Sequence, residues 1–190
     1  HFLSIQGSLK NPHATTSFLD NAADVLGDQP LYLHLLVRHP NCGPTLLDQL
    51  SRSRHQSIVS AAARHSHINP ERLTALASPG RLKVRASALS NKNTATEIVN
   101  KALVDPSHVL RAGAAQNPQI SSEQLWLLRY DPSSKVRKQL ASHAHASPQL
   151  LKILARDIDP KVRLAVAKNS QTDLKCVLNL LQQEHIKADV

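Results

Sequence analysis

Apolar residues recur along this chain with a period of 26 residues, and the register is kept without insertions or deletions from residue 32 onward, after a first unit whose loop is two residues longer. One apolar column contains Leu47, Leu73, Val99, Leu125, Leu151 and Val177. A second column, three residues further on, contains Leu50, Leu76, Ala102, Leu128, Leu154 and Leu180. Because residues at i and i+3 share one face of an α-helix, the two columns predict a helix with a buried face in every repeat.

The period predicts a stacked repeat protein. A fixed period of this length is typical of solenoids, in which each repeat packs on its neighbours. We therefore expect an all-α solenoid without strands, built from about seven two-helix repeats. The expected units lie near residues 4–31, 32–57, 58–83, 84–109, 110–135, 136–161 and 162–190, and together they form a single repeat domain over residues 1–190.

Helix starts can be read from another column. Side chains that accept hydrogen bonds from free helical amides recur at the same position of the repeat, as Asn69, Ser121, Ser147 and Asp173. Proline follows at the first helical position of three repeats, where it costs the helix no hydrogen bond, as Pro44, Pro70 and Pro148. The second helix of each repeat is expected to begin there.

A column of histidine and asparagine, which we call the polar ladder, follows the first helix of each repeat. It contains His39, His65, Asn91, Asn117, His143 and Asn169, with Asn11 in a degenerate first unit that begins near Ser4. These residue types tolerate a left-handed backbone or bond free carbonyls at a helix end. A ligand seldom requires one group from every repeat, so the expected role is structural.

The repeat resembles that of the leucine-rich repeat variant family, whose units read VR-x-A-V-A-x-N-P-x-x-P-x-x-L-L-x-x-L-A-x-D-x-D. The segment VRKQLASHAHASPQLLKILARDIDPKVRLAVAKN, residues 136–169, carries the resemblance. It implies alternating helices, some of them short 3₁₀ turns, wound into a right-handed superhelix related to HEAT repeats. A member of this family carries a cysteine-bound iron–sulfur cluster, but no cofactor is expected here, because Cys42 and Cys176 are the only cysteines.

The formal net charge of +9 is concentrated in the middle of the chain. Residues 32–104 hold few acidic groups among the basic residues Arg38, Arg52, Arg54, Arg64, Arg72, Arg81, Lys83, Arg85, Lys92 and Lys101. In a solenoid, equivalent positions lie in a row, so repeated cations form a stripe that attracts acidic proteins or phosphates. Arg38, Arg64, Arg85 and Lys92 are candidate contacts of such a partner.

An arginine near the start of four repeats calls for a separate explanation. Asp105, Asp131 and Asp157 precede Arg111, Arg137 and Arg163 by six residues, and this spacing predicts Asp–Arg pairs that tie neighbouring repeats together. Arg85 has Pro79 at the equivalent place, so no partner within the chain is predicted for it. The other three arginines and their aspartates are expected to be structural.

An aromatic patch forms the second candidate surface. Trp126 falls in a mostly polar column, and Tyr130, four residues on, is expected on the same helix face. The equivalent residues of the next repeat are Lys152 and Arg156. Exposed aromatic rings beside cations are typical of protein-interaction sites, and a ring lying over the core is the alternative.

Catalytic and metal-binding patterns are missing from the sequence. It contains no GxGxxG, GxxxxGK[ST] or GxSxG motif. The pairs His65-x-His67 and His143-x-His145 have no further ligands nearby, so no metal is expected. Trp126, Tyr130 and Asp131 leave a HEAT-like DNA glycosylase as a remote alternative.

The sequence therefore predicts a non-enzymatic scaffold that presents a basic surface and an aromatic patch to a protein partner, for which an acidic protein is the natural choice. A duplex nucleic-acid-binding solenoid that uses the same basic stripe is the alternative. No apolar run of about 18 residues is present, so no membrane span is expected. Two isolated cysteines favour a cytoplasmic protein, and we expect a monomer or a weak oligomer.

Overall fold

The computed structural model describes residues 7–78 and 80–188, and within these ranges the chain is helical and contains no strand. The helices alternate between a first and a second position in the repeat. The first helices are α3 (Pro30–Arg38), α5 (Gln56–Arg64), α7 (Leu82–Leu89), α9 (His108–Ala114), α11 (Ser134–Ser142) and α13 (Pro160–Ala167). The second helices are α2 (Thr16–Leu26), α4 (Pro44–Leu50), α6 (Pro70–Ala77), α8 (Thr96–Leu103), α10 (Ser122–Leu127), α12 (Pro148–Leu154) and α14 (Leu174–Ala188). The predicted start of the degenerate unit, near Ser4, lies outside the described residues.

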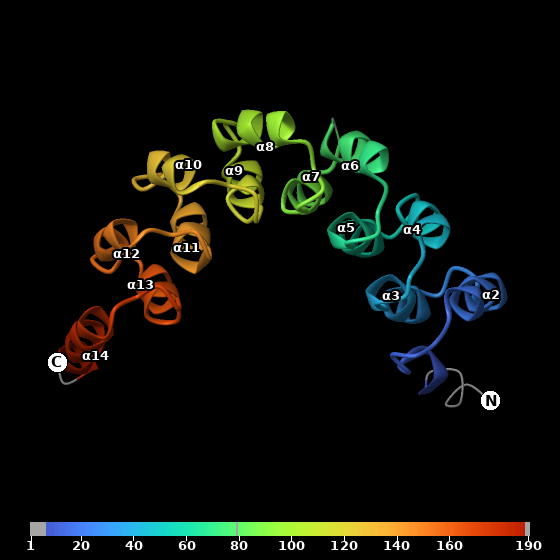
Figure 1. The fold of residues 1–190 in the computed structure, drawn as a ribbon, viewed down its shortest axis with the longest axis horizontal. Coiled ribbons are helices and arrows are strands. Elements are labelled where there is room, and N and C mark those ends of the chain that lie inside the picture. Colours follow the sequence, from blue (N-terminus) through green and yellow to red (C-terminus); the bar gives the residue numbers. More distant parts are fainter. Residues whose placement is uncertain (1–6, 79, 189–190) are drawn as a thin grey trace. The chain divides into compact units, whose positions relative to one another are not determined.

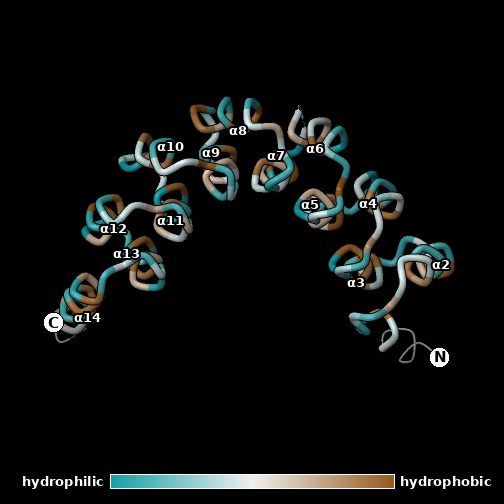
Figure 2. Tube along the Cα trace, in the orientation of Figure 1, coloured by the Kyte–Doolittle hydropathy of each residue, from teal (hydrophilic) through white to brown (hydrophobic). Residues whose placement is uncertain are grey.

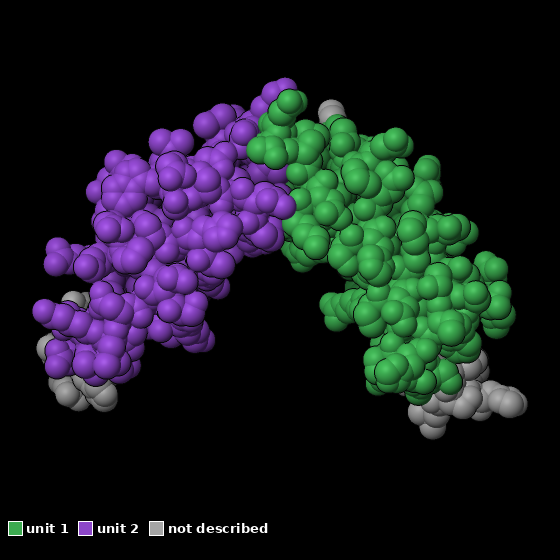
Figure 3. Space-filling view, in the orientation of Figure 1, with its two compact units in different colours: residues 1–98 green, residues 99–190 purple. Residues whose placement is uncertain are grey.

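The chain divides into two compact units, residues 1–98 and residues 99–190 (Figure 3). In the first unit, α3, α5 and α7 pack side by side in a row, and α4 and α6 lie against that row (Figure 1). In the second unit, α9, α11 and α13 form the row, and α12 and α14 pack against it. We call the row of first helices the odd row, and the second helices that lie against it the even row. Each unit is thus a two-layered stack of helix pairs, as a solenoid requires.

The predicted helix starts are confirmed. The Asn69 side chain accepts a hydrogen bond from the Glu71 N–H, and Ser147 accepts one from the Leu150 N–H. Ser121 forms a complete capping box with Gln124. Pro44, Pro70 and Pro148 occupy the first helical position, where the missing N–H leaves no bond unmade.

The core lies between the two rows and is built from the predicted apolar columns. Leu73 and Leu125 are fully buried, and Leu151 is 1% exposed. Apolar and polar positions alternate within each helix, as Figure 2 shows, because one face of every helix contacts the other row. Alanines such as Ala62, Ala88 and Ala114 on the odd row are fully buried, so neighbouring odd helices can approach closely.

The polar ladder connects consecutive repeats. His65 donates through Nε2 to the His39 carbonyl, 3.1 Å away and 26 residues earlier. Asn91 donates through Nδ2 to the carbonyls of Ala63 and His65, at 2.8 and 2.9 Å. The same bond to the preceding repeat is made by His39 to Asn11, His143 to Asn117, and Asn169 to Ala141 and His143. Each bond reaches a backbone carbonyl at or just after the end of the first helix in the preceding repeat.

The same side chains also close their own turns. The N–H of Asn93 donates to Asn91 Oδ1 at 2.9 Å, and the N–H of His67 donates to His65 Nδ1 at 3.2 Å. The left-handed backbone that we considered for this column is wrong, because no described non-glycine residue has a positive φ. The other form of contact that we considered for this column, the bonding of carbonyls at the end of a first helix, is the one that the described side chains make.

These contacts fix the protonation of the ladder histidines. In His65 and His143, Nδ1 accepts a backbone N–H and Nε2 donates to a carbonyl, so the ring must be neutral with its proton on Nε2. Burial lowers the pKa of both side chains below the ordinary value, and the neighbouring His67 and His145 act in the same direction.

The arginine column forms buried ion pairs, but in a register that differs from the prediction. Arg111 binds Asp131, twenty residues later, through Nε–Oδ2 and Nη2–Oδ1 contacts of 2.6 and 2.9 Å. Its other nitrogen donates to the backbone carbonyl of Asp105, which was the predicted carboxylate partner. Arg137 repeats the pattern with the Asp157 side chain and the Asp131 carbonyl. The Arg111 side chain reaches the loop at the end of its own repeat, where Asp131 lies. The Asp131 carboxylate is nearer to the guanidinium than the carboxylate of Asp105, six residues before Arg111.

Arg163 follows the same plan through its backbone contacts, since it is 7% exposed and donates to the carbonyls of Asp157 and Ile158. The Asp131 carboxylate also accepts the Ser133 N–H, 2.8 Å away. Burial disfavours the charge on Asp131, but the bonds from Arg111 and Ser133 outweigh it and lower the pKa of the carboxyl. Each arginine therefore ties its own repeat to the preceding one.

The resemblance implied some 3₁₀ helices, and none is present among the described residues. The first helices have seven to nine residues, which is enough for two α-turns. Tight i to i+3 bonds occur at helix ends, such as His39 N–H to Leu36 O, and in the turns between helices, such as Cys42 N–H to His39 O.

Stability should fall with acid because of the ladder histidines. Above pH 6.5, the ordinary pKa, His65 and His143 are neutral in both states and the fold pays no penalty. Below it, the unfolded chain takes up protons more readily than the folded one, so the free energy of unfolding decreases until the folded pKa is passed. Urea unfolding at several pH values measures this slope. The double variant His65→Asn and His143→Asn, which copies the asparagine repeats, should flatten it, and an unchanged slope would contradict the assignment.

The buried ion pair should matter more than an exposed one. Asp131→Asn leaves the mostly buried Arg111 guanidinium without its carboxylate and should lower the free energy of unfolding by about 3 kcal/mol. Asp48→Asn is the matched control, since Asp48 pairs with Arg52 at the surface and should cost less than about 1 kcal/mol. Equal losses in urea unfolding of the two variants would show that Asp131 has no special structural role.

Candidate functional site

Charge is segregated between the rows. None of the odd-row helices contains an aspartate or glutamate, whereas arginine or lysine occurs in every one of them. The exposed cations of this row are Arg38, Arg64 and Lys83 in the first unit, and Lys135, Lys138, Lys161 and Lys168 in the second. We call the surface formed by these residues in each unit the odd-row face.

Helical spacing explains why these cations share a surface. Lys161, Leu164 and Lys168 follow an i, i+3, i+7 pattern at α13, which places them on one helix face. Lys135 and Lys138 occupy the first two of these positions on α11, which packs directly on α13. Leu164 is 54% exposed, so an apolar side chain lies within the basic surface.

The positive charge of this face is largely uncompensated. None of its cations forms an ion pair within the part of the chain that the structure describes. Asp159 lies just before α13, where its side chain accepts the Lys161 N–H. A hydrogen bond from Ser134, the Lys161 N–H and the charge of Lys161 lower the pKa of Asp159, so Lys161 is partly neutralised. Lys135, Lys138 and Lys168 are the lysines of this face in the second unit that form no ion pair with a described residue and do not follow a capping aspartate as Lys161 does.

The structure separates the four basic candidates of the middle stretch. Arg38 and Arg64 lie on the odd-row face of the first unit. Lys92 is exposed in the turn after α7. Arg85 is half-buried, and its Nε donates to the Ala77 carbonyl at 3.2 Å, so the expectation that it lacks a partner within the chain is wrong. Pro79, on which that expectation depended, lies outside the described residues.

Trp126 and Tyr130 come together through a residue that the sequence analysis did not consider. Helix α10 ends at Leu127, so Tyr130 lies in the following turn and not on a shared helix face as predicted. The Arg129 guanidinium carbon lies 4.8 Å from the centre of each ring. Trp126 is 36% exposed and Tyr130 is 71% exposed. We call these three residues the aromatic cluster.

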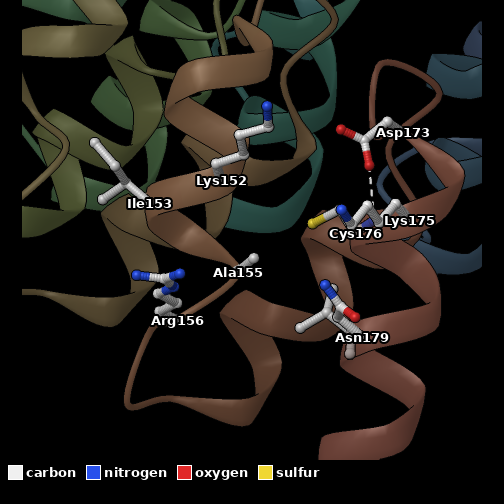
Figure 4. Close-up of a pocket in the computed structure, with 9 residues that line it drawn as sticks. Lys152, Ile153, Ala155, Arg156, Asp173, Lys175, Cys176 and Asn179 are labelled. Atoms are coloured by element: carbon white, nitrogen blue, oxygen red, sulfur yellow. Dashed lines mark hydrogen bonds between the residues drawn. The ribbon is translucent and has the colours of Figure 1, made fainter.

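Two grooves lie on either side of α12, and Arg156 lines both of them, whereas Lys152 lines one. The first, of about 370 Å³, brings Arg156 and Ile153 together with Arg129 and Tyr130 of the aromatic cluster. The second, of about 690 Å³, lies between α12 and α14 and includes both Lys152 and Arg156 (Figure 4). The structure thus brings Tyr130 and Arg156 to one groove, and Lys152 joins Arg156 in the other.

Ring nitrogens of the histidine pairs already form hydrogen bonds with backbone groups. His67 Nδ1 lies 3.2 Å from the Cys42 carbonyl, and both nitrogens of His65 are used by the ladder. His143 and His145 repeat this arrangement. Among the described residues, no group of three or more potential ligands could hold a metal ion. In the same part of the chain, no helix combines the length and the apolar character that crossing a bilayer demands.

Sequence reasoning missed Lys135, Lys138, Lys161 and Lys168, because charge was compared segment by segment. The second half of the chain has many acidic residues, which hide its lysines in such a count. A comparison by position in the repeat would have found them, since no unit has an acid at the positions of the odd helices.

No protein-family model matches the chain, and no curated protein matches it. Among solved structures, the chain is similar to a leucine-rich repeat variant with a novel repetitive protein structural motif. The two are 18% identical, the match covers 90% of this chain and 86% of that chain, and the TM-score is 0.45. A match at this level carries no argument about the function of this chain.

Proposed function

We propose that the chain is a non-enzymatic scaffold that binds an acidic protein partner through the odd-row face. The observation that carries the proposal is a basic surface on helices that contain no acids, and this surface includes the exposed Leu164 between Lys161 and Lys168. Cations attract an acidic partner and orient it during the encounter, and an apolar side chain adds contact area that needs no charge. Repeats extend the surface along each unit.

Duplex nucleic acid is the second candidate, because phosphates also bind to rows of lysine. The two candidates differ in what they require of Leu164. A phosphate backbone gains nothing from an exposed leucine, whereas a protein partner can cover it with its own apolar groups. Leu164 therefore favours the protein partner.

The aromatic cluster supports a second contact area of the same scaffold. The Arg129 guanidinium lies against the rings of both Trp126 and Tyr130, and its Nη1 donates a hydrogen bond to the Trp126 carbonyl at 2.9 Å. Aromatic and arginine side chains that are partly exposed and held in place lose little freedom on binding. We infer that the cluster anchors an apolar group of the partner.

The odd-row face can be tested with two probes: a long peptide of glutamate and leucine, and duplex DNA of mixed sequence. Replacing Lys135, Lys138 and Lys168 with alanine should weaken peptide binding by about tenfold, since each exposed charge contributes up to about 1 kcal/mol. Fluorescence anisotropy of the labelled peptide measures the change. A variant with Arg52, Arg54 and Lys101 replaced, which removes the same charge from exposed positions outside the odd-row face and outside both grooves beside α12, is the matched control and should bind more tightly than the odd-row variant.

Leu164→Ala distinguishes the two partners. It should weaken peptide binding and leave DNA binding unchanged, and it should alter stability little because the side chain is exposed. Tight DNA binding that falls steeply with salt, combined with peptide binding that ignores the lysine substitutions, would replace the protein proposal with the nucleic-acid one.

The aromatic cluster can be followed through its own fluorescence, because Trp126 is the only tryptophan. A partner that covers the cluster should shift the emission of Trp126 to shorter wavelengths. The glutamate and leucine peptide is the first probe, and Arg129→Ala should reduce the shift. Saturating peptide without any spectral change would remove the aromatic cluster from the binding surface.

A further inference from the structure

The groove between α12 and α14 has a volume of about 690 Å³. Its walls are the outward faces of two even-row helices, so it is a different surface from the odd-row face. In Figure 4, Lys152 extends from α12, and Cys176 and Asn179 project from α14 beside the space between the helices. The volume lies within the range of about 300–1,000 Å³ that is typical of ligand sites.

Three cations line the groove, namely Lys152, Arg156 and Lys175. All three are exposed, and none forms a hydrogen bond or an ion pair through its side chain within the described residues. Among the described residues of the lining, Asp173 is the one carboxylate, and its Oδ1 accepts the Cys176 N–H at 2.7 Å. With three cations and one carboxylate, the described lining of the groove is positive overall.

The floor of the groove is apolar. Leu180 is 4% exposed, Ala155 is 8% exposed and Ile153 is half-buried. A small inorganic anion would meet the cations and leave this floor in contact with water. A ligand that carries carboxylates on both sides of an aliphatic side chain would satisfy the cations and cover the floor.

We propose that the groove between α12 and α14 binds a short acidic peptide segment of a protein partner, with an aliphatic side chain of the segment on Ile153 and Leu180. Lys152 and Lys175 lie on opposite walls and take carboxylates from two sides of the segment. Arg156 offers a planar guanidinium that suits a third carboxylate. Because Arg156 and Ile153 also line the groove beside Tyr130, a longer segment continues across α12 toward the aromatic cluster.

The groove contains its own chemical reporter. Cys176 lines it and is partly accessible, and burial and the charge of Asp173 raise the pKa of its thiol, whereas the charge of Lys152 acts in the opposite direction. Cys42 is fully buried, and burial raises the pKa of its thiol to about 12. Thiol reagents will therefore react with Cys176 long before they reach Cys42.

The experiment measures how fast a maleimide labels Cys176 in the full chain. The probe is an acetylated and amidated peptide, Glu-Leu-Glu-Glu, and the neutral control is Gln-Leu-Gln-Gln. The acidic peptide should slow labelling severalfold at saturation, and the neutral one should not. Replacing Lys152 and Arg156 with alanine should raise the peptide concentration needed for half protection by about tenfold. Rates are compared with and without peptide for each variant, because Lys152 also affects the thiol.

The matched control replaces Lys135 and Lys138, which lie on the odd-row face, and should leave protection unchanged. Loss of protection in this control, or equal protection by the neutral peptide, would overturn the proposal. Protection by inorganic phosphate as strong as that by the acidic peptide would identify a small-anion site instead. Protection that grows with the concentration of the chain alone would mean that a second copy occupies the groove. Failure here leaves the proposed function of the odd-row face standing, since the substitutions expected to weaken binding and the readouts differ between the two surfaces.

Discussion

The fold depends on one double hydrogen bond that recurs at the turn after each first helix. The side chain there must accept a backbone N–H from two residues ahead and donate to a carbonyl of the preceding repeat. Asparagine and neutral histidine meet both conditions, which explains why the column contains only these two types. The donated bond to the preceding ladder residue spans 26 residues for His65 and His143 and 28 residues for His39, so it is kept where the first repeat is two residues longer. Local turn geometry and the contact between consecutive repeats thus depend on the same atoms.

The segregation of charge follows from how this protein uses its acids. Asp105, Asp131 and Asp157 each accept the N–H two residues later, at the entrance to the next odd helix. Asp159 and Asp173 cap helix starts. These aspartates therefore lie in turns, where backbone N–H groups lack other acceptors. The exposed sides of the odd helices contribute no such hydrogen bonds to the fold. These sides can hold cations without disturbing the fold, and that freedom is what makes the odd-row face a candidate surface.

The sequence predicted the features that the period alone determines. Leu73 and Leu125 are buried because their column faces the other row in every repeat, and Asn69 and Ser147 cap helices because only local geometry is involved. Prediction failed where distances between repeats decide the contact. Arg111 was assigned to the carboxylate nearest in sequence, but Asp131 is nearer in space. Tyr130 was placed on a helix that ends three residues before it. The lysines of α11 and α13 were hidden by acids that lie elsewhere in the repeat.

The absence of acids from the odd helices has a further electrical consequence. The cations of one row act together on a large polyanion that approaches through water, so they orient it and draw it toward the row before any atoms touch. The placement of Asp131 and Asp157 in the turns thereby influences the speed and the pose of association, even though both carboxylates are enclosed by arginine and never meet the incoming molecule.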